Sequence, residues 1–363
     1  MLLLHVVGAR PNFPKLAPVY RAARAAGHTQ VVVHTGQHYD DAMSASFFRE
    51  LEIPAPDVNL EVGSASHAAQ TARVMEAIEP VLLERQPDWV LDYGDVNSTM
   101  AAALVAVKLG IRVAHVEAGL RSYDRAMPEE INRVVTDRIV DLLLTPSRDA
   151  DATLRGEGVP EGRIAFVGNV MIDSLFHALR SIPADAGEAR RVVHVRRPMQ
   201  RDDDRSRLAA LADALRELAT ERPVVFPVHP RTRQRLAAAG LDLGAVRLLD
   251  PIPYREMLAF VARAHAVVTD SGGLQEETTA LGVPCFTVRD NTERPVTITE
   301  GTNRLVRDLA TLAPLVRAAR PPAAPRRPEG WDGEAGHRVI AALQAFAPPA
   351  EVAPDADLAL ARG

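Results

Sequence analysis

Residues 89–119 read WVLDYGDVNSTMAAALVAVKLGIRVAHVEAG and contain one complete unit of an α/β fold. The apolar run Trp89–Tyr93 predicts a buried strand, and the short run Val113–Val116 predicts a second one. The alanine-rich stretch between them has the length of a helix. A strand, a crossover helix and another strand predict two parallel neighbours in one sheet. Asp95 and Glu117 then stand at the carboxyl ends of these strands, where α/β proteins bind ligands.

The same alternation extends in both directions and then restarts, which predicts a two-domain chain. The strands expected in the first half are Leu2–Val7, Val31–Thr35, Trp89–Tyr93, Val113–Val116, Leu142–Thr145 and Ile164–Val167, and those in the second half are Arg191–Val195, Val224–Pro227, Val246–Leu249, Ala266–Thr269 and Cys285–Val288. The expected helices are Leu16–Ala26, Thr71–Arg85, Thr99–Leu109, Glu130–Ile139, Ile172–Arg180, Arg207–Thr220, Arg231–Ala239, Arg255–Ala264 and Leu274–Leu281. The pattern predicts the α/β fold class, with two Rossmann-like domains whose parallel sheets face a central cleft.

Composition shifts divide the chain into segments. The loop Ile182–Glu188, rich in Pro, Ala and Gly, separates the two halves, and we expect an N-terminal domain over residues 1–169 and a C-terminal domain over residues 170–346. The proline-rich stretch Pro321–Pro328 predicts a linker before a last helix near Gly336–Phe346, which could pack back on the first domain. The acidic tail, residues 347–363, offers little to bury and is predicted to be disordered.

Bulk composition excludes several classes of protein. The 363 residues carry a net charge of −5, so a nucleic-acid partner is not expected. The single cysteine, Cys285, excludes a disulfide framework and a thiolate metal cage, and fits a reducing, cytoplasmic location. No apolar run approaches the ~20 residues of a membrane-spanning helix, so no membrane association is expected.

The first strand leads into a motif that fits phosphate. Gly8 ends the strand, and the following residues 9–15 bring Arg10 and Lys15 to the start of a helix. A helix N-terminus beside a glycine is a common site for phosphate in α/β proteins. The GxGxxG spacing and a Walker lysine are missing, which argues against dinucleotide and ATP sites. The alternative interpretation is that the two cations are solvated charges beside a turn.

Three acids follow neighbouring strand ends or open the next helix. Asp95 and Glu117 follow apolar strands, and Glu129 lies in the first turn of a predicted helix. Capping would explain Asp95 by itself, and the helix dipole would explain Glu129. Three acids at one sheet edge also suit a site in which carboxyl groups divide the acid and base roles.

A second cradle is predicted in the second half. The backbone of Ser271, Gly272 and Gly273 precedes a helix and could hold a diphosphate, with Glu277 one turn later placed for ribose hydroxyls. Arg294 follows a later strand end and could reach sugar or phosphate oxygens, and His229 also follows a strand. The histidines show no metal-binding spacing and no serine has a GxSxG context, so neither a metal nor another cofactor is expected.

Taken in order, these motifs resemble those of the non-hydrolysing UDP-N-acetylglucosamine 2-epimerases, which share a two-domain fold with glycosyltransferases of the GT-B type. The resemblance runs from about Leu3 to Val306. The motifs that carry it are Gly8–Lys15, Thr35–His38, Gly94–Thr99, His115–Arg121, Pro128–Arg133, Gly168–Asp173, Ser271–Glu277 and Thr292–Pro295.

The resemblance implies a UDP-sugar substrate, inversion at C2 through loss and readdition of UDP, and a homodimer. It makes Asp95, Glu117 and Glu129 the acid and base candidates. It assigns the remaining candidates to substrate binding: Arg10, Lys15 and Ser271–Gly273 to the diphosphate, Glu277 to the ribose, Arg133 and Arg294 to the sugar, and His38 and His229 to the same site.

The chain departs from the family pattern at several places, among them Arg138, the stretches Gln37–Asp40 and Met199–Asp202, and two positions that bear directly on the site. The family's second domain opens with a strand that ends in Thr-x-His-Arg, and Arg196 stands here in place of that histidine. A fixed cation thereby replaces a group that can exchange protons near neutral pH. Met257 stands where an aromatic residue commonly lies near the uracil. Three hypotheses remain: a UDP-N-acetylglucosamine 2-epimerase, a UDP-sugar hydrolase that releases free sugar and UDP, and a non-catalytic UDP-sugar-binding relative.

Overall fold

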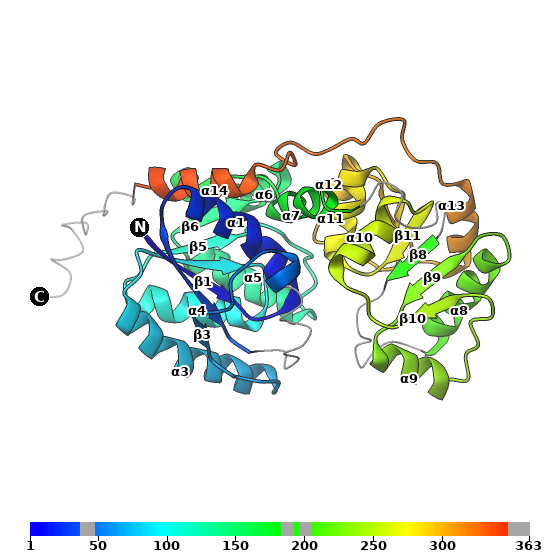
Figure 1. Ribbon diagram of the computed structural model, residues 1–363, viewed down its shortest axis with the longest axis horizontal. Helices are drawn as coiled ribbons and strands as arrows, with labels where there is room; N and C mark the ends of the chain where they lie inside the picture. The colour runs from blue at the N-terminus through cyan, green and yellow to red at the C-terminus, as the bar shows by residue number, and fades with distance from the viewer. Residues whose placement is uncertain (37–47, 183–191, 196–204, 348–363) are drawn as a thin grey trace, which may run out of the picture.

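The computed structural model describes residues 1–36, 48–182, 192–195 and 205–347. The chain forms two α/β halves that lie side by side, joined by helix α7 (Val170–Leu179) and by a long return segment before the last helix (Figure 1). The predicted segments at 183–188 and 348–363, and the residues His38 and Arg196, lie outside the described residues.

The first domain is built on a seven-stranded parallel sheet in the order β3-β2-β1-β4-β5-β6-β7. Its strands are β1 (Leu2–Val7), β2 (Thr29–His34), β3 (Val58–Asn59), β4 (Trp89–Tyr93), β5 (Val113–Val116), β6 (Leu142–Thr145) and β7 (Ile164–Phe166). Its helices are α1 (Phe13–Ala25), α3 (His67–Arg85), α4 (Asn97–Lys108), α5 (Pro128–Ile139) and α6 (Arg148–Gly156). The strand order reverses between β1 and β4, which places a ligand crevice at their carboxyl ends.

The second domain repeats the plan with a six-stranded parallel sheet in the order β10-β9-β8-β11-β12-β13. Its strands are β8 (Val192–Val195), β9 (Val224–Pro227), β10 (Arg247–Leu249), β11 (Ala266–Thr269), β12 (Cys285–Thr287) and β13 (Asn303–Leu305). Its helices are α8 (Arg205–Ala219), α9 (Pro230–Ala238), α10 (Tyr254–Ala262), α11 (Gly272–Leu281), α12 (Val296–Thr299) and α13 (Leu312–Ala318). The order reverses between β8 and β11, so the start of α11 lies at the second crevice.

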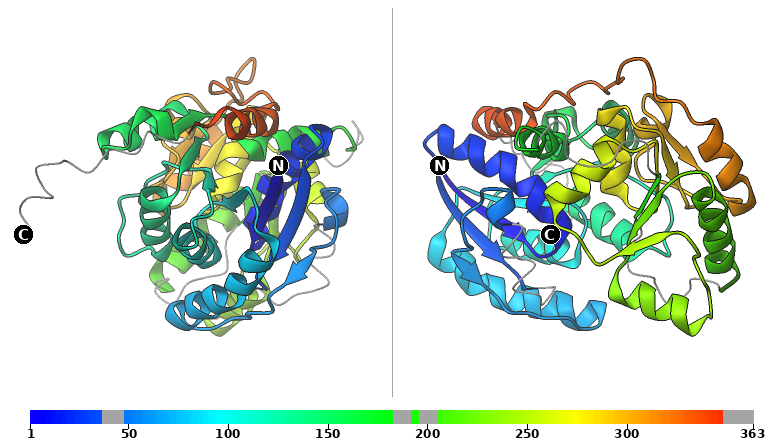
Figure 2. Two further views of the ribbon diagram at one scale, coloured as in Figure 1. Left: turned by 90° about the vertical axis from the view of Figure 1, so that its left-hand side faces the viewer. Right: turned by 45° about the vertical axis from the view of Figure 1, so that its right-hand side comes forward.

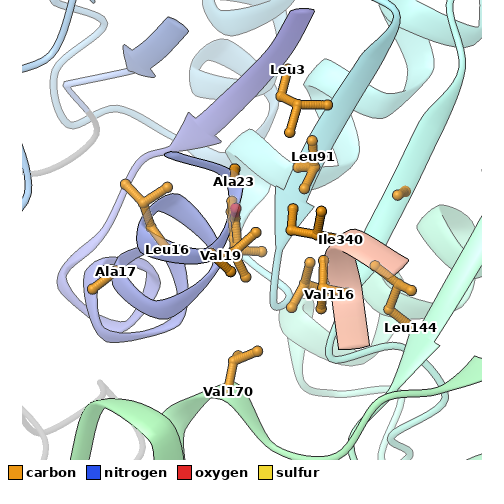
Figure 3. Close-up of a cluster of buried hydrophobic side chains, with 14 of the residues drawn as sticks. Leu3, Leu16, Ala17, Val19, Ala23, Leu91, Val116, Leu144, Val170 and Ile340 are labelled. Atoms are coloured by element: carbon orange, nitrogen blue, oxygen red, sulfur yellow. The ribbon is translucent and has the colours of Figure 1, made fainter. Parts of the chain in front are cut away.

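The last helix, α14 (Ala335–Ala345), returns to the first domain and lies beside α1 in Figures 1 and 2. Its apolar side packs into the first core, where Ile340 lies near Val19, Leu91 and Val116 (Figure 3). Burial of such side chains contributes about 1.5–3 kcal/mol each. The helix is thus part of the first domain in space although it follows the second in sequence.

Hydrogen bonds of three side chains stabilise the crossing between the halves. The side chain of Ser174 on α7 donates to the carbonyl of Pro14 at 2.5 Å, and Trp331 Nε1 donates to the carbonyl of Pro146 at 3.0 Å. The carboxylate of Asp173 accepts the backbone N–H of Ala335 at 3.2 Å and that of Gly336 at 2.8 Å, at the start of α14. Because α7 packs against elements of both halves, the boundary at residue 169 stays a prediction.

The predicted α/β class is confirmed, and each predicted strand and helix has a counterpart. The strands β1, β4, β5, β6, β9 and β11 have the predicted bounds, and the other predicted elements differ by a few residues at their ends. The sequence patterns missed β3, β13, α6, α12 and α13. β3 has two residues, β13 contains Asn303 and Arg304, and α6 is rich in charged residues, so none carries a clear apolar period. In the described part of the chain, no helix combines the length and apolar character needed to span a bilayer.

Candidate functional site

The crevice of the first domain is lined by the loops after β1 and β4. Gly94 has φ +67°, and a Cβ there would lie 2.6 Å from Lys15 Nζ, so only glycine fits beside this lysine. Lys15 is buried in the first turns of α1 instead of being solvated beside the turn. Arg10 differs, because it is half-buried and forms no ion pair with the described residues.

Glu117 lies at the centre of the site. It follows β5 with φ +76°, a conformation that is uncommon for a residue other than glycine and often marks functional positions. Its Oε2 lies 2.7 Å from Lys15 Nζ, and its Oε1 accepts Arg294 Nη2 at 2.8 Å. Arg294 belongs to the second domain, so this carboxylate joins cations from both halves.

Arg294 is held by three carboxylates. Besides Glu117, its Nε lies 3.0 Å from Glu276 Oε1 and its Nη1 donates to Glu293 Oε1 at 2.5 Å. Burial opposes the charge of Arg294, but these acids outweigh burial and raise its pKa above the usual range. Glu293 is also paired with Arg289 at 2.9 Å. Although burial alone would raise the pKa of Glu293, the neighbouring arginines, Arg294 first, hold it well below the usual range.

Asp95 is fixed from α5. Its Oδ2 accepts Arg133 Nη2 at 2.5 Å, and its backbone carbonyl accepts Asn132 Nδ2 at 2.9 Å. Burial raises the pKa of Asp95, but Arg133, and then Lys15 and Arg294, outweigh burial and lower it overall. The alternative capping role is not observed, because the N-cap of α4 is Val96.

Glu129 and its neighbour Glu130 have different surroundings in the first turn of α5. Glu130 accepts the backbone N–H groups of Ser122 at 2.9 Å and Tyr123 at 2.9 Å and pairs with Arg133. Oε2 of Glu129 is buried without a hydrogen-bond partner among the described residues. Oε2 of Glu129 can therefore accept a hydrogen bond from a ligand, whereas both oxygens of Glu130 already accept hydrogen bonds from the protein.

The second crevice holds the predicted phosphate and ribose residues. The N–H of Ser271 donates to Thr269 Oγ1 at 2.9 Å, so this amide is already used. Gly272 and Gly273 open α11, where the first N–H groups have no acceptor within the helix. Glu277 accepts the hydroxyl of Tyr254 at 2.7 Å, and burial raises its pKa to about 7.

Met257 and His229 lie at the edges of this region. Met257 packs against the apolar cluster that contains Val261 and Leu274, next to the start of α11. His229 is half-buried and directly precedes α9. No group of three or more potential ligands that could hold a metal ion occurs within the described ranges.

Several residues of the site were not found from sequence. Glu276 and Glu293 surround Arg294, Asn169 donates to Glu276 Oε1 at 2.9 Å, and Tyr254 holds Glu277. The sequence did contain a signal for Glu276 and Glu293, because each directly precedes a predicted site residue, Glu277 or Arg294. Nothing in the pattern around Asn169 or Tyr254 indicated a partner so far away in the chain.

The arrangement suits departure of an anion combined with proton transfer. Buried cations from both halves converge on one place, and ionised or unpartnered carboxyl groups lie beside them. Cations fixed in advance stabilise negative charge that develops on a leaving group, and a carboxylate held in its charged form can accept a proton.

Comparison with known proteins agrees with this geometry. The family model described as UDP-N-acetylglucosamine 2-epimerase matches residues 21–344. A UDP-N-acetylglucosamine 2-epimerase homolog of Methanococcus maripaludis is 44% identical over 320 residues, covering 84% of this chain and 88% of the relative. A UDP-2,3-diacetamido-2,3-dideoxy-D-glucuronate 2-epimerase of Pseudomonas aeruginosa is 42% identical over 313 residues, with coverages of 84% and 88%.

Solved structures give the same result. The crystal structure of Methanocaldococcus jannaschii UDP-GlcNAc 2-epimerase in complex with UDP-GlcNAc and UDP superposes with a TM-score of 0.86 at 37% identity, covering 95% of this chain and 99% of that one. The GT-B-like fold is thereby confirmed, and the epimerase hypothesis is favoured over the hydrolase and the non-catalytic relative. The chain belongs to the UDP-N-acetylglucosamine 2-epimerase family.

Proposed function

We propose that this enzyme interconverts UDP-N-acetylglucosamine and UDP-N-acetylmannosamine. The observation that carries the proposal is the junction of Lys15 and Glu117 with Arg294, which places buried cations and a carboxylate from both domains at one point. A UDP-sugar suits this junction because its diphosphate needs cations and its sugar carbon needs an acid and a base.

The chemistry follows from the carbon whose configuration is inverted, C2 of the sugar. The hydrogen on C2 is not next to a carbonyl, so its direct removal is unfavourable. When a carboxylate takes the C2 proton, the electron pair forms a C1–C2 double bond and the C1–O bond breaks, releasing UDP and leaving a glycal. Addition of the UDP oxygen to C1 and of a proton to the opposite face of C2 restores the bonds with C2 inverted. Electrons balance without a redox cofactor.

We assign the roles as follows. Asp95 is the proton acceptor best supported by its surroundings, because Arg133 keeps it charged. Glu117 and Glu129 are the other acid and base groups, and Glu129 has a buried free oxygen to offer. Loss of UDP develops charge on phosphate oxygens, which Arg10, Lys15 and the N–H groups of Gly272 and Gly273 would stabilise.

The remaining contacts position the nucleotide and sugar. Glu277, held by Tyr254, would accept the ribose hydroxyls, while Arg133 and Arg294 would orient the sugar. Met257 would offer an apolar surface to the uracil without aromatic stacking. The remaining substrate-binding candidates are His38, Arg196 and His229. Closure of the two domains would keep the glycal from escaping.

We also propose a cytoplasmic homodimer. Ile131 and Val134 on α5 are exposed, as is Tyr123, which has φ +58°. Exposed apolar side chains grouped on one helix fit a protein interface. The buried thiol of Cys285 fits a reducing compartment.

The substrate is tested by incubating the protein separately with UDP-N-acetylglucosamine and with a UDP-linked diacetamido glucuronate. Proton NMR of the anomeric signals would show a second epimer appearing with the preferred sugar. A new epimer from the first compound supports the proposal. Turnover of the glucuronate alone would mean that the substrate is the one named for the Pseudomonas relative. Formation of free sugar and UDP would indicate hydrolysis.

A further inference from the structure

A chain of polar contacts runs from the crossing between the domains to the carboxylate at the centre of the site. Asn169 Nδ2 donates to Glu276 Oε1 at 2.9 Å, the same oxygen lies 3.0 Å from Arg294 Nε, and Arg294 Nη2 reaches Glu117 at 2.8 Å. All four residues are buried, with exposed fractions of 1%, 1%, 6% and 6%. Contacts in such surroundings are stronger than at the surface, and a missing partner costs more.

Asn169 is anchored at the crossing. Its Oδ1 accepts the N–H of Met171 at 2.9 Å and so caps α7, the helix that leaves the first domain. Gly168 before it has φ +81° and packs directly on the carbonyl of Gly330 in the return segment. Asn169 is therefore held beside the two segments that connect the domains, α7 and the return segment around Gly330.

Glu276 fixes the plane of the Arg294 guanidinium. A guanidinium is rigid and planar, so contacts on two of its edges set the direction of the third. Glu276 Oε1 pairs with Nε at 3.0 Å as an ion pair without hydrogen-bond alignment, and Glu293 accepts Nη1, which leaves Nη2 directed at Glu117. The second oxygen of Glu276 is buried without a hydrogen-bond partner among the described residues. Burying an unpaired carboxylate oxygen lowers stability, which suits a residue that serves the site and not the fold.

We propose that Glu276 is a positioning residue for the elimination step, acting through Arg294 on Glu117, and that Asn169 ties it to the crossing between the domains. This inference rests on the proposed function. Glu276 itself need not touch the substrate. If Glu276 loses its negative charge, Arg294 loses one of the three carboxylates that hold it. Its guanidinium can then move away from Glu117.

The charge of Glu276 is sensitive to pH in the neutral range. Burial raises its pKa to about 7, Arg294 and Lys15 oppose the rise, and Glu117 adds to it. Among the described residues, these groups and the adjacent Glu277 are the charged side chains that influence it most. As pH falls through about 7, Glu276 takes up a proton and its hold on Arg294 weakens.

The test compares Glu276→Gln with wild type and with the exposed control Glu300→Gln. The glutamine keeps the shape and an acceptor oxygen but removes the charge. We expect kcat to fall about 100-fold with KM changed less than about threefold, because a displacement of about 1 Å in a catalytic group costs on that order. The part of the acid limb of the kcat–pH profile that Glu276 contributes should disappear in Glu276→Gln and not in the control, whereas Glu277, whose pKa burial also raises to about 7, titrates in both.

Asn169→Ser provides a second variant that protects the fold. Serine caps a helix as well as asparagine does, but it is too short to reach Glu276 in the same way. A smaller loss of kcat is expected, together with a cooperative thermal unfolding transition that shows the variant to be folded, although at a somewhat lower Tm because a buried hydrogen bond is lost. Unchanged kcat and pH profile in Glu276→Gln, or a rise in KM alone, would overturn the inference.

Crystal structures of wild type and Glu276→Gln with UDP separate this inference from the proposed function. If Arg294 leaves Glu117 in the variant, the positioning role stands even where wild type fails to epimerise UDP-N-acetylglucosamine. If Arg294 stays on Glu117, the inference is wrong whatever the activity.

Discussion

Arg294 of the second domain donates to Glu117 of the first at 2.8 Å, although the two residues are 177 positions apart in the chain. Neither domain contains this pair by itself. The Arg294–Glu117 pair therefore exists only when the halves are together, so the proposed closure of the domains would also complete the proposed catalytic groups.

Replacement of Arg294 by lysine tests this junction. Lysine keeps the charge but has no planar fork, so it cannot meet Glu117, Glu276 and Glu293 together. We expect kcat/KM to fall about 100-fold or more, on the scale of removing one preorganised donor. Steady-state kinetics measure the change, with the exposed Arg24→Lys as control. Activity close to wild type would show that a single charge is sufficient.

Asp95→Asn removes the proposed proton acceptor with little change of shape. Turnover should be nearly abolished, while UDP binding measured by calorimetry should stay within about threefold of wild type, because Asp95 contacts Arg133 and not the phosphate cradle. Survival of turnover would mean that the proton is taken by Glu117 or Glu129.

Gly272→Ala moves Arg294 without changing any charge. A Cβ at position 272 would fall against Arg294 Nη1, with Cζ at 2.8 Å and Glu293 Oε1 at 2.9 Å. Because the guanidinium is clamped by carboxylates, it cannot yield without leaving them, and we expect a loss of activity of about tenfold or more. Gly162→Ala, where a Cβ meets nothing within 4 Å, is the steric control. Equal activity in both variants would contradict the tight fit.

Asp173 makes stability depend on pH. Burial raises its pKa to about 6, against the opposing N–H groups of Gly336 and Ala335. The folded chain thus holds a proton that the unfolded chain loses near pH 4, so this contribution is present at low pH and is lost as pH rises from about 4 to 6. The change is at most about 3 kcal/mol.

Asp173→Asn should flatten this dependence, because the amide keeps an acceptor oxygen and does not titrate. Urea unfolding between pH 4 and 7.5 measures it, with the exposed Asp250→Asn as control. A slope that is the same in wild type and Asp173→Asn would assign the pH dependence to other groups.

Arg196→His introduces the histidine that the resemblance to the family predicts at this position. Near neutral pH a histidine can deliver a proton that arginine cannot, so the variant should raise epimerisation relative to release of UDP. The ratio of the two products by NMR is the measurement. An unchanged ratio would show that Arg196 does not control the fate of the glycal.

The sequence predicted that Asp95 and Glu117 lie at one sheet edge, because parallel strands bring their carboxyl ends together whatever lies between them in the chain. The partners of Arg294 were missed for the opposite reason. Glu276 and Glu293 lie in the same domain as Arg294, and their pairing with it depends on how the loop after β12 packs against α11. The contact of Asn169 with Glu276 depends on how the crossing between the domains packs against α11. Such contacts leave no period in the sequence. Tyr254 stands one residue before the predicted helix Arg255–Ala264, and nothing in that pattern indicated that its hydroxyl donates to Glu277.

The central claim, that C2 is inverted by loss and readdition of UDP at this junction, is tested most directly by exchange with solvent. The protein is incubated with UDP-N-acetylglucosamine in deuterium oxide and followed by proton NMR. The account predicts loss of the C2 proton signal in the UDP-linked sugar together with the appearance of the second epimer. Formation of the second epimer with the C2 proton fully retained would contradict it.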